Sequence, residues 1–244
     1  MSAISPRLGQ LYGISVGPGD PELITVKGLK RLQTSPVVAF PAGVRSPLGV
    51  AQRIIQPWLQ PHQTLLPLDF PMVQDAPQLQ RAWDQAAHRS LPYLQQGQDI
   101  AFVSEGDVSF YSTYTYLALT LKGLCPDLKT EAIPGVCSPL AAAAALEIPL
   151  TIQSDRLVVL PALYQGEDLA AALEQADVLV LMKVGAVYAQ VWQLLQRLHL
   201  LDRSALIVHA SQPQQKIYRD LTAYAHLAPP YFSLMIVQVK GAKF

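Results

Sequence analysis

The alternation of short β-branched runs with helical patterns is the feature that most constrains what this chain can fold into. Residues 11–16 form an apolar run typical of a buried strand, and a helix start signal follows it. There Asp20 can cap free amide groups and Pro21 suits the first helical position. Strands that alternate with helices favour mainly parallel sheets covered by helices. The sequence therefore predicts an α/β fold.

The same patterns place the remaining elements and suggest two domains. The expected strands are residues 11–16, 36–40, 65–68, 99–104, 129–133, 156–160, 177–182, 205–209 and 233–239. The expected helices are residues 20–33, 48–59, 77–95, 112–121, 138–146, 167–175 and 186–198. So many strands in a chain of 244 residues suggest two sheets rather than one. We expect two α/β domains, each around a mainly parallel or mixed sheet, spanning residues 1–126 and 127–244.

Composition and charge exclude several classes of protein. Half of the residues are hydrophobic and only 15% are charged, so a sizeable core is available. Lys plus Arg equals Asp plus Glu at 18 each, which lacks the basic excess of a nucleic-acid-binding protein. The longest apolar run, residues 140–146, is far shorter than the roughly 20 residues of a membrane-spanning helix. Because the N-terminus also has no signal-peptide layout, we expect a cytoplasmic protein without a membrane partner.

Cysteine and histidine usage does not indicate a metal site. Cys125 and Cys137 are the only cysteines and form no CxxC pair, so we expect free, reduced thiols. The five histidines are scattered, and none stands four residues from another or beside a cysteine. We therefore expect no protein-bound metal.

A glycine-rich turn follows the first expected strand, where open α/β sheets bind ligands. Its glycines stand at Gly13, Gly17 and Gly19 and can let the backbone approach a ligand closely. The spacing differs from the dinucleotide fingerprint, and no GK[ST] of a P-loop follows. A simple tight turn explains the same residues equally well.

A second turn, residues 104–113, follows the fourth expected strand. Gly106 frees the backbone, Asp107 can accept a hydrogen bond from a sugar hydroxyl, and Ser112 and Thr113 begin a helix. Four aromatic residues nearby can line a flat pocket: Phe110, Tyr111, Tyr114 and Tyr116. A capped helix with its aromatic side chains in the core is the simpler interpretation.

Three more expected strands end in turns with candidate ligand-binding or catalytic residues. Pro134 and Gly135 precede Ser138, which can cap a helix or reach a ligand. Lys183 and His209 close two later strands, where each can face a cleft or water. His209 is the histidine that we retain as a candidate acid or base. No GxSxG elbow or other catalytic triad is evident.

These five turns, in this order and spacing, resemble the tetrapyrrole (corrin/porphyrin) methylase family from residue 11 to about residue 239. The segments that carry the resemblance are VGPGDPELIT (16–25), EGDVSFYSTYTYL (105–117), IPGVCSPLAAAAALEIPL (133–150) and PYFSLMIV (230–237). The resemblance implies two α/β domains with the active site in the cleft between them, in a homodimer. It also implies that S-adenosylmethionine lies folded in that cleft, held largely by backbone groups.

Cofactor contacts carry over from the family by position. The implied residues are Pro18, Glu105, Gly106, Asp107, Phe110, Ser112, Thr113, Cys137, Ser138, Met182 and Ala210. Glu105 and Val108 depart from the Gly-Gly-Asp-Pro sequence of many members, and the valine puts the stiffness of the loop in doubt. Cys137 replaces a commoner Ser or Thr, which puts its side-chain contact in doubt.

The resemblance further implies methyl transfer from S-adenosylmethionine to carbon 20 of precorrin-2 or cobalt-factor II, in cobalamin biosynthesis. The protein's main task would be to position the reactants and exclude water. Tyr111, Tyr114 and His209 are candidates for a general base. The substrate carries eight carboxylates, and Arg45 is placed to pair with one of them, with Lys183 a weaker choice. An exposed loop residue is the equal alternative for Arg45.

Two other functions stay open. The same fold serves methylases of other tetrapyrrole positions, diphthine synthase and a ribosomal-RNA methylase, and the neutral net charge argues mildly against RNA. A binding protein that keeps the cofactor site without catalysis is the second alternative.

Overall fold

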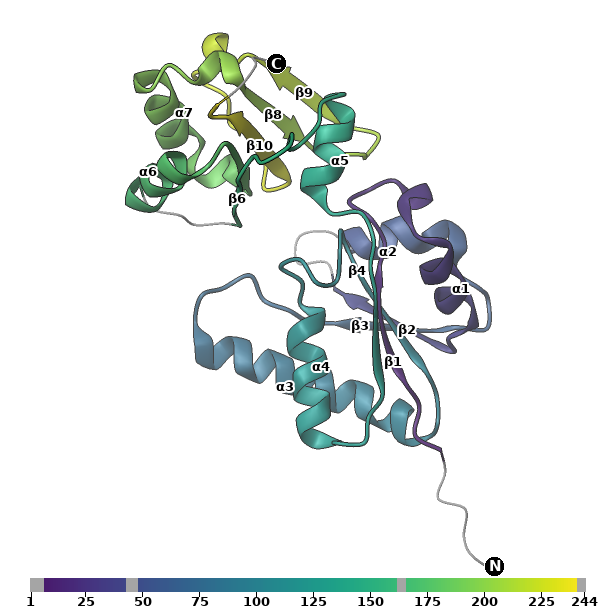
Figure 1. The fold of residues 1–244 in the computed structure, drawn as a ribbon. Helices are drawn as coiled ribbons and strands as arrows, with labels where there is room; N and C mark the ends of the chain where they lie inside the picture. The colour runs from purple at the N-terminus through teal and green to yellow at the C-terminus, as the bar shows by residue number, and fades with distance from the viewer. Residues whose placement is uncertain (1–6, 43–47, 162–165, 241–244) are drawn as a thin grey trace, which may run out of the picture. The chain divides into compact units, whose positions relative to one another are not determined.

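The computed structural model describes residues 7–42, 48–161 and 166–240. The chain divides into two compact units, Met1–Cys137 and Ser138–Phe244. Each unit contains a five-stranded sheet (Figure 1). The predicted α/β fold with two sheets is therefore confirmed.

The first sheet is parallel throughout and has the order β3-β2-β4-β1-β5. Its strands are β1 (Leu11–Ser15), β2 (Val37–Pro41), β3 (Thr64–Leu68), β4 (Ile100–Ser104) and β5 (Thr130–Ile133). Because parallel strands all end at the same edge, the loops that follow them gather there. This carboxyl edge therefore brings together the turns that the sequence singled out in this unit.

Helices cover both faces of the first sheet (Figure 1). They are α1 (Val26–Thr34), α2 (Val50–Ile55), α3 (Ala76–Gln95) and α4 (Tyr114–Leu124), with short 3-10 turns η1 (Pro21–Leu23) and η2 (Gln56–Trp58). Alternate residues of β4 show the division: Ile100 and Phe102 pack with α3 and α4, whereas Ala101 and Val103 pack with α1 and α2. Burial on both faces explains why these strands are continuously apolar.

The first predicted helix, residues 20–33, is interrupted. Asp20 caps only the short η1, where its carboxylate accepts from the Glu22 amide at 2.9 Å. Ile24 and Thr25 then adopt extended backbone, and the Thr25 hydroxyl accepts from the Gly28 amide at 3.1 Å to start α1. The sequence carries two cap residues in succession, and the second one starts the α-helix.

The second sheet is mixed and has the order β6-β7-β10-β8-β9. Its strands are β6 (Leu157–Leu160), β7 (Val178–Met182), β8 (Ser204–Val208), β9 (Lys216–Arg219) and β10 (Ser233–Gln238). β6 and β7 are parallel, whereas β10 runs antiparallel to both β7 and β8, and β9 is antiparallel to β8. The edge strand β9 was not predicted, because its half-exposed sequence KIYR has no apolar alternation.

Helices also cover both faces of the second sheet. They are α5 (Ser138–Ala145), α6 (Gly166–Gln175) and α7 (Tyr188–Arg197), with 3-10 turns η3 (Val184–Val187), η4 (Leu201–Arg203) and η5 (Leu221–Ala223). α6 and α7 pack on one face, and α5 packs on the other through Ala142 and Ala143. The small alanine side chains let α5 approach the sheet closely, so the alanine run is helix interior as predicted.

The fifth strand belongs to the first sheet, whereas the expected domain ranges place it at the start of the second domain. β5 pairs with β1 in parallel register, Leu11 opposite Thr130 and Ile14 opposite Ile133, so it completes the first sheet. The division of the chain falls later, between Cys137 and Ser138. β5 therefore lies in the same unit as β1, the strand that it pairs with.

Across the described ranges of the chain, no helix has the length and apolar character needed to cross a membrane. Within the same ranges, His, Cys, Asp and Glu side chains form no group of three or more that could hold a metal ion.

Candidate functional site

The turns after β1 and β4 are joined at the carboxyl edge of the first sheet. Gly106 donates its amide to the Gly17 carbonyl at 2.8 Å, and Gly17 donates to the Gly106 carbonyl at 3.3 Å. Both residues have positive φ, 76° for Gly17 and 72° for Gly106, which glycine adopts without steric cost. These two backbone bonds fix the two glycine turns against each other.

Asp107 ties the β4 turn to the β5 turn. One carboxylate oxygen accepts from the Gly135 amide at 2.7 Å, and the other accepts from the Ser109 amide at 2.7 Å. Each oxygen has a second lone pair, so the carboxylate can accept further hydrogen bonds from a ligand. Asp107 is therefore a structural residue that also keeps capacity for the predicted sugar contact.

The buried hydroxyl of Ser15, at the end of β1, supports the same junction. It lies 2.7 Å from the Ile133 carbonyl and 3.3 Å from the Asp107 carboxylate, and it accepts from the Val108 amide at 2.9 Å. Its single proton serves one acceptor at a time, and the shorter distance favours the carbonyl. Ser15 was not among the predicted site residues; the signal was a single serine at the end of a buried strand.

Gly135 is needed for the close approach of the β5 turn to β1. A Cβ atom built on Gly135 would lie 2.5 Å from the Ser15 Cβ, which is closer than real side chains come. Above Gly106 the space is open, since the nearest atom to its ideal Cβ is the Cys137 Cα at 4.0 Å. Gly106 thus lies beside Cys137, with open space above its backbone.

The aromatic residues of the β4 turn divide into two groups. Phe110 and Tyr111 pack edge to face with ring centroids 4.7 Å apart, and Tyr111 is 55% exposed. Tyr114 instead lies in the core, where its ring occupies the space left by the missing side chain of Gly13. Its hydroxyl donates to the Glu131 carbonyl at 3.3 Å, and burial raises the pKa of the phenol. A buried phenol with a raised pKa is unsuited to take a proton from a substrate, which argues against Tyr114 as the base.

Ser112 has a local role at the start of α4. Its hydroxyl lies 2.8 Å from that of Ser104 and accepts from the Tyr114 amide at 3.1 Å. Thr113 is the residue before the helix, and its side chain makes no cap hydrogen bond to α4. Ser112, one residue earlier, is thus the side chain that supports the start of the helix.

Met182 and Ala210 come to one edge of the second sheet. β10 lies between β7 and β8 and runs antiparallel to both, so its start lies beside their ends. The His209 amide donates to the Phe232 carbonyl at 2.8 Å across this edge. Both Met182 and Ala210 are partly buried against the α5 side of the sheet. Their role as cofactor contacts stays a prediction.

At the same edge, three residues other than glycine adopt the left-handed backbone conformation. Lys183, His209 and Ser211 have φ of 55°, 52° and 59°. Such a conformation costs about 1–3 kcal/mol per residue and is concentrated at functional sites. The Lys183 ammonium lies 5.5 Å from the centre of the Tyr231 ring, a cation–π contact that orients it.

His209 keeps an unsatisfied ring nitrogen. Its Nδ1 is buried and has no hydrogen-bond partner among the residues that the structure describes. The ring lies 5.9 Å from that of Phe232. A buried polar atom left unpaired costs about 1–3 kcal/mol, so a bound ligand that pairs with it gains stability. His209 therefore stays a candidate for contact with a ligand.

The predicted site residues belong to two separate groups. Pro18, Glu105, Gly106, Asp107, Phe110, Ser112, Thr113 and Cys137 are in the first unit, and Ser138, Met182 and Ala210 are in the second. Arg45 lies outside the described residues. The predicted cleft shared by both domains stays a prediction.

Comparisons with known proteins cover most of the chain. Residues 10–224 match the family model of tetrapyrrole (corrin/porphyrin) methylases. The chain is 32% identical to a cobalt-precorrin-2 C(20)-methyltransferase of Salmonella typhimurium, covering 94% of this chain and 96% of the relative. It is 30% identical to a precorrin-2 C(20)-methyltransferase of a Sinorhizobium species, covering 94% and 95%.

Solved structures share the fold. A cobalt precorrin-4 methyltransferase superimposes with a TM-score of 0.74 at 24% identity, covering 95% of this chain and 96% of its own. A uroporphyrin-III C-methyltransferase of Thermus thermophilus, in complex with S-adenosylhomocysteine, gives 0.65 at 22% identity, covering 94% and 97%. The resemblance seen in the sequence is confirmed, and the chain belongs to the tetrapyrrole (corrin/porphyrin) methylase family.

Proposed function

We propose that the protein transfers a methyl group from S-adenosylmethionine to carbon 20 of precorrin-2 or cobalt-factor II, in cobalamin biosynthesis. The observation that carries this proposal is the similarity to two C(20)-methyltransferases along nearly the full length of all three chains. The turns at Gly17, Gly106 and Gly135 add support, because they lie at the carboxyl edge of the sheet and leave backbone groups there open to a ligand.

The residues of the first unit fit a cofactor that is bound largely by backbone groups. Gly106 has positive φ and open space above it, so a ligand can approach its backbone. Asp107 retains acceptor capacity for the ribose hydroxyls beside its two amide bonds. In the second unit, Met182 and Ala210 offer apolar contacts that suit the flat adenine.

S-adenosylmethionine, when bound, supplies an electrophilic methyl group that the electron-rich meso carbon of the substrate takes up. For this reaction the protein has little covalent work to do, so its residues chiefly orient the reactants and exclude water. His209 and Tyr111 remain the candidates to hold a proton, because one has a buried free ring nitrogen and the other an exposed hydroxyl.

The test is incubation of the purified protein with S-adenosylmethionine and either precorrin-2 or cobalt-factor II, followed by the mass of the product. We expect a gain of one methyl group, and the preferred substrate distinguishes the metal-free from the cobalt-containing reaction. Mixtures that lack the tetrapyrrole serve as the control for spontaneous breakdown of S-adenosylmethionine. If neither substrate gains a methyl while the cofactor still binds, the proposed substrate is wrong.

We further propose that the protein works as a cytoplasmic homodimer, which family membership supports. Light scattering on the purified protein tests the oligomeric state. A mass near twice that of one 26.7 kDa chain is expected, and the mass of a single chain would contradict it.

A further inference from the structure

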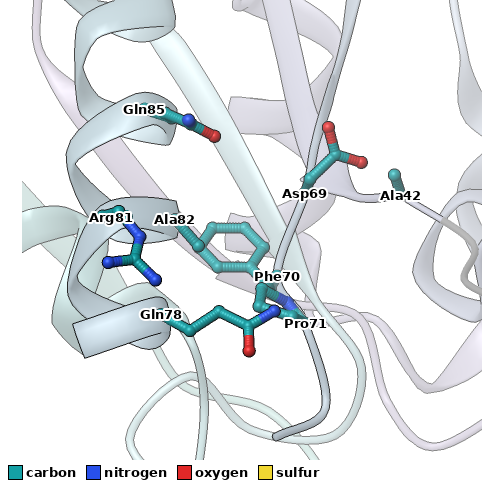
Figure 2. A pocket seen from close by; sticks show the side chains of 8 residues that line it. All are labelled: Ala42, Asp69, Phe70, Pro71, Gln78, Arg81, Ala82 and Gln85. Atoms are coloured by element: carbon teal, nitrogen blue, oxygen red, sulfur yellow. The ribbon is translucent and has the colours of Figure 1, made fainter. Parts of the chain in front are cut away.

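A pocket of about 390 Å³ lies in the first unit beside the start of α3 (Figure 2). It is lined by Ala42, Asp69, Phe70, Pro71, Gln78, Arg81, Ala82 and Gln85. The four residues from α3 are spaced three, four and seven positions from the first, so they share one face of the helix. The other four follow β2 and β3, which puts the pocket at the carboxyl edge of the sheet.

The pocket has an apolar floor and a polar wall. Phe70 is 9% exposed and packs edge-on against Phe102, with ring centroids 6.0 Å apart. Figure 2 shows its ring between the α3 side chains and Asp69, while Arg81 and Gln78 extend from the helix beside it. A ligand that fits must therefore combine a short apolar part with a polar end.

The polar wall favours an anion. Arg81 is exposed and forms no ion pair within the described parts of the chain. Among the described lining residues the acidic one is Asp69, whose exposed carboxylate lies 3.8 Å from the Arg89 guanidinium. Gln78 and Gln85 can add amide donors on either side of Arg81. A guanidinium flanked by amides suits a carboxylate, which it can bind through two parallel hydrogen bonds.

The pocket lies along the same sheet edge as the glycine turns. In the order β3-β2-β4-β1-β5, three steps separate β1 from β3. Neighbouring strands are spaced so that these steps span about 14 Å. The periphery of a large macrocycle that lies along this edge can therefore reach from the glycine turns to the pocket.

We propose that this pocket binds one carboxylate side chain of the tetrapyrrole substrate. The carboxylate pairs with Arg81, and the methylene groups that carry it pack on Phe70, Pro71 and Ala82. This assignment rests on the proposed function, since it requires a substrate with carboxylate arms. It makes Arg81 a residue that selects and orients the substrate without contact with the cofactor.

The experiment compares the wild-type protein with Arg81→Gln, using uroporphyrin III as a stable probe with eight carboxylates. Fluorescence titration should give a dissociation constant about three- to tenfold higher for the variant, the effect of losing one partly exposed ion pair. In the methylation assay KM should rise by a similar factor with kcat little changed. Arg81→Lys should recover part of the affinity, and the difference should shrink at high salt.

Controls separate this proposal from the proposed function. Arg197→Gln removes an exposed arginine from α7 and should leave probe binding unchanged. Affinity for S-adenosylhomocysteine, measured by calorimetry, should be the same in all variants. Equal probe affinity and KM in the wild type and Arg81→Gln would overturn the pocket assignment. If the wild type methylates no tetrapyrrole but Arg81→Gln still weakens probe binding, the pocket stands and the proposed reaction falls.

Discussion

Asp107 combines two roles in one carboxylate. It accepts two backbone amides that hold the β4 and β5 turns, and it is the proposed acceptor for the cofactor ribose. We predict that Asp107→Ala weakens S-adenosylhomocysteine binding and lowers the free energy of unfolding by about 1–3 kcal/mol, because the Ser109 and Gly135 amides lose a charged acceptor. Calorimetric titration and chemical unfolding measure the two effects.

The two roles of Asp107 can be separated by comparison of variants. Asp107→Asn retains one acceptor oxygen of similar size and should lose less stability than Asp107→Ala. Asp127→Ala, which changes an exposed carboxylate before β5, is the matched control and should alter neither quantity. Wild-type affinity in Asp107→Ala would remove Asp107 from the cofactor site and leave it a structural residue.

We predict that Tyr188 makes the free energy of unfolding depend on pH in the alkaline range. Its side chain is buried, its hydroxyl donates to the Tyr224 carbonyl at 2.9 Å, and burial raises its pKa from 10.0 to about 12. The folded state thus holds this proton more tightly than the unfolded state does. The stabilisation is complete below pH 10 and is lost as the pH rises toward 12, because the unfolded phenol ionises first. Unfolding experiments across this range should show the decline, and Tyr188→Phe should reduce its slope. An identical slope in the variant would contradict this assignment.

Among the elements, those with a strong apolar pattern were predicted best. The buried strands β1, β2, β4 and β7 and the long helix α3 agree with the predicted ranges to within a residue or two. The interruption before α1 was missed because two cap residues, Asp20 and Thr25, compete within one helical pattern. β9 was missed because an edge strand needs no apolar alternation.

Side-chain networks at the site were beyond the reach of sequence reasoning. Ser15 and Asp107 stand far apart in the chain and meet only because β1 lies between β4 and β5. Tyr114 was a candidate base because it follows a conspicuous turn, yet its ring fills the space beside Gly13. The apolar pattern predicts strands and helices but not which of them lie side by side, so it could predict neither the contact of Ser15 with Asp107 nor the packing of Tyr114 on Gly13.

The β5 turn depends on the missing side chain of Gly135. A Cβ there would lie 2.5 Å from the Ser15 Cβ, so the turn must move away from β1 and stretch the bond from Gly135 to Asp107. We predict that Gly135→Ala lowers the free energy of unfolding by about 1–3 kcal/mol. Chemical unfolding measures the loss, and calorimetry should show weaker S-adenosylhomocysteine binding.

Gly123 provides the matched control for this substitution. It lies in α4 with no atom within 4 Å of an added Cβ, so Gly123→Ala should be neutral or stabilise by up to about 1 kcal/mol. If Gly135→Ala proves as stable as Gly123→Ala, the turn has more freedom than its contact with Ser15 implies.

For the molecule as a whole, the two units have separate cores and separate sheets, yet the proposed cofactor residues come from both. We therefore predict that S-adenosylhomocysteine slows amide hydrogen exchange in both units, because a ligand that binds only the native state suppresses opening wherever it makes contacts. The protected segments should include the turn at Gly106 and Asp107 and the turn at His209 and Ala210. Mass spectrometry of peptides from the free and the bound protein locates the protection, and Asp107→Ala should reduce it at equal ligand concentration. Protection confined to the first unit would mean that Met182 and Ala210 belong to the packing of the second sheet and not to the cofactor site.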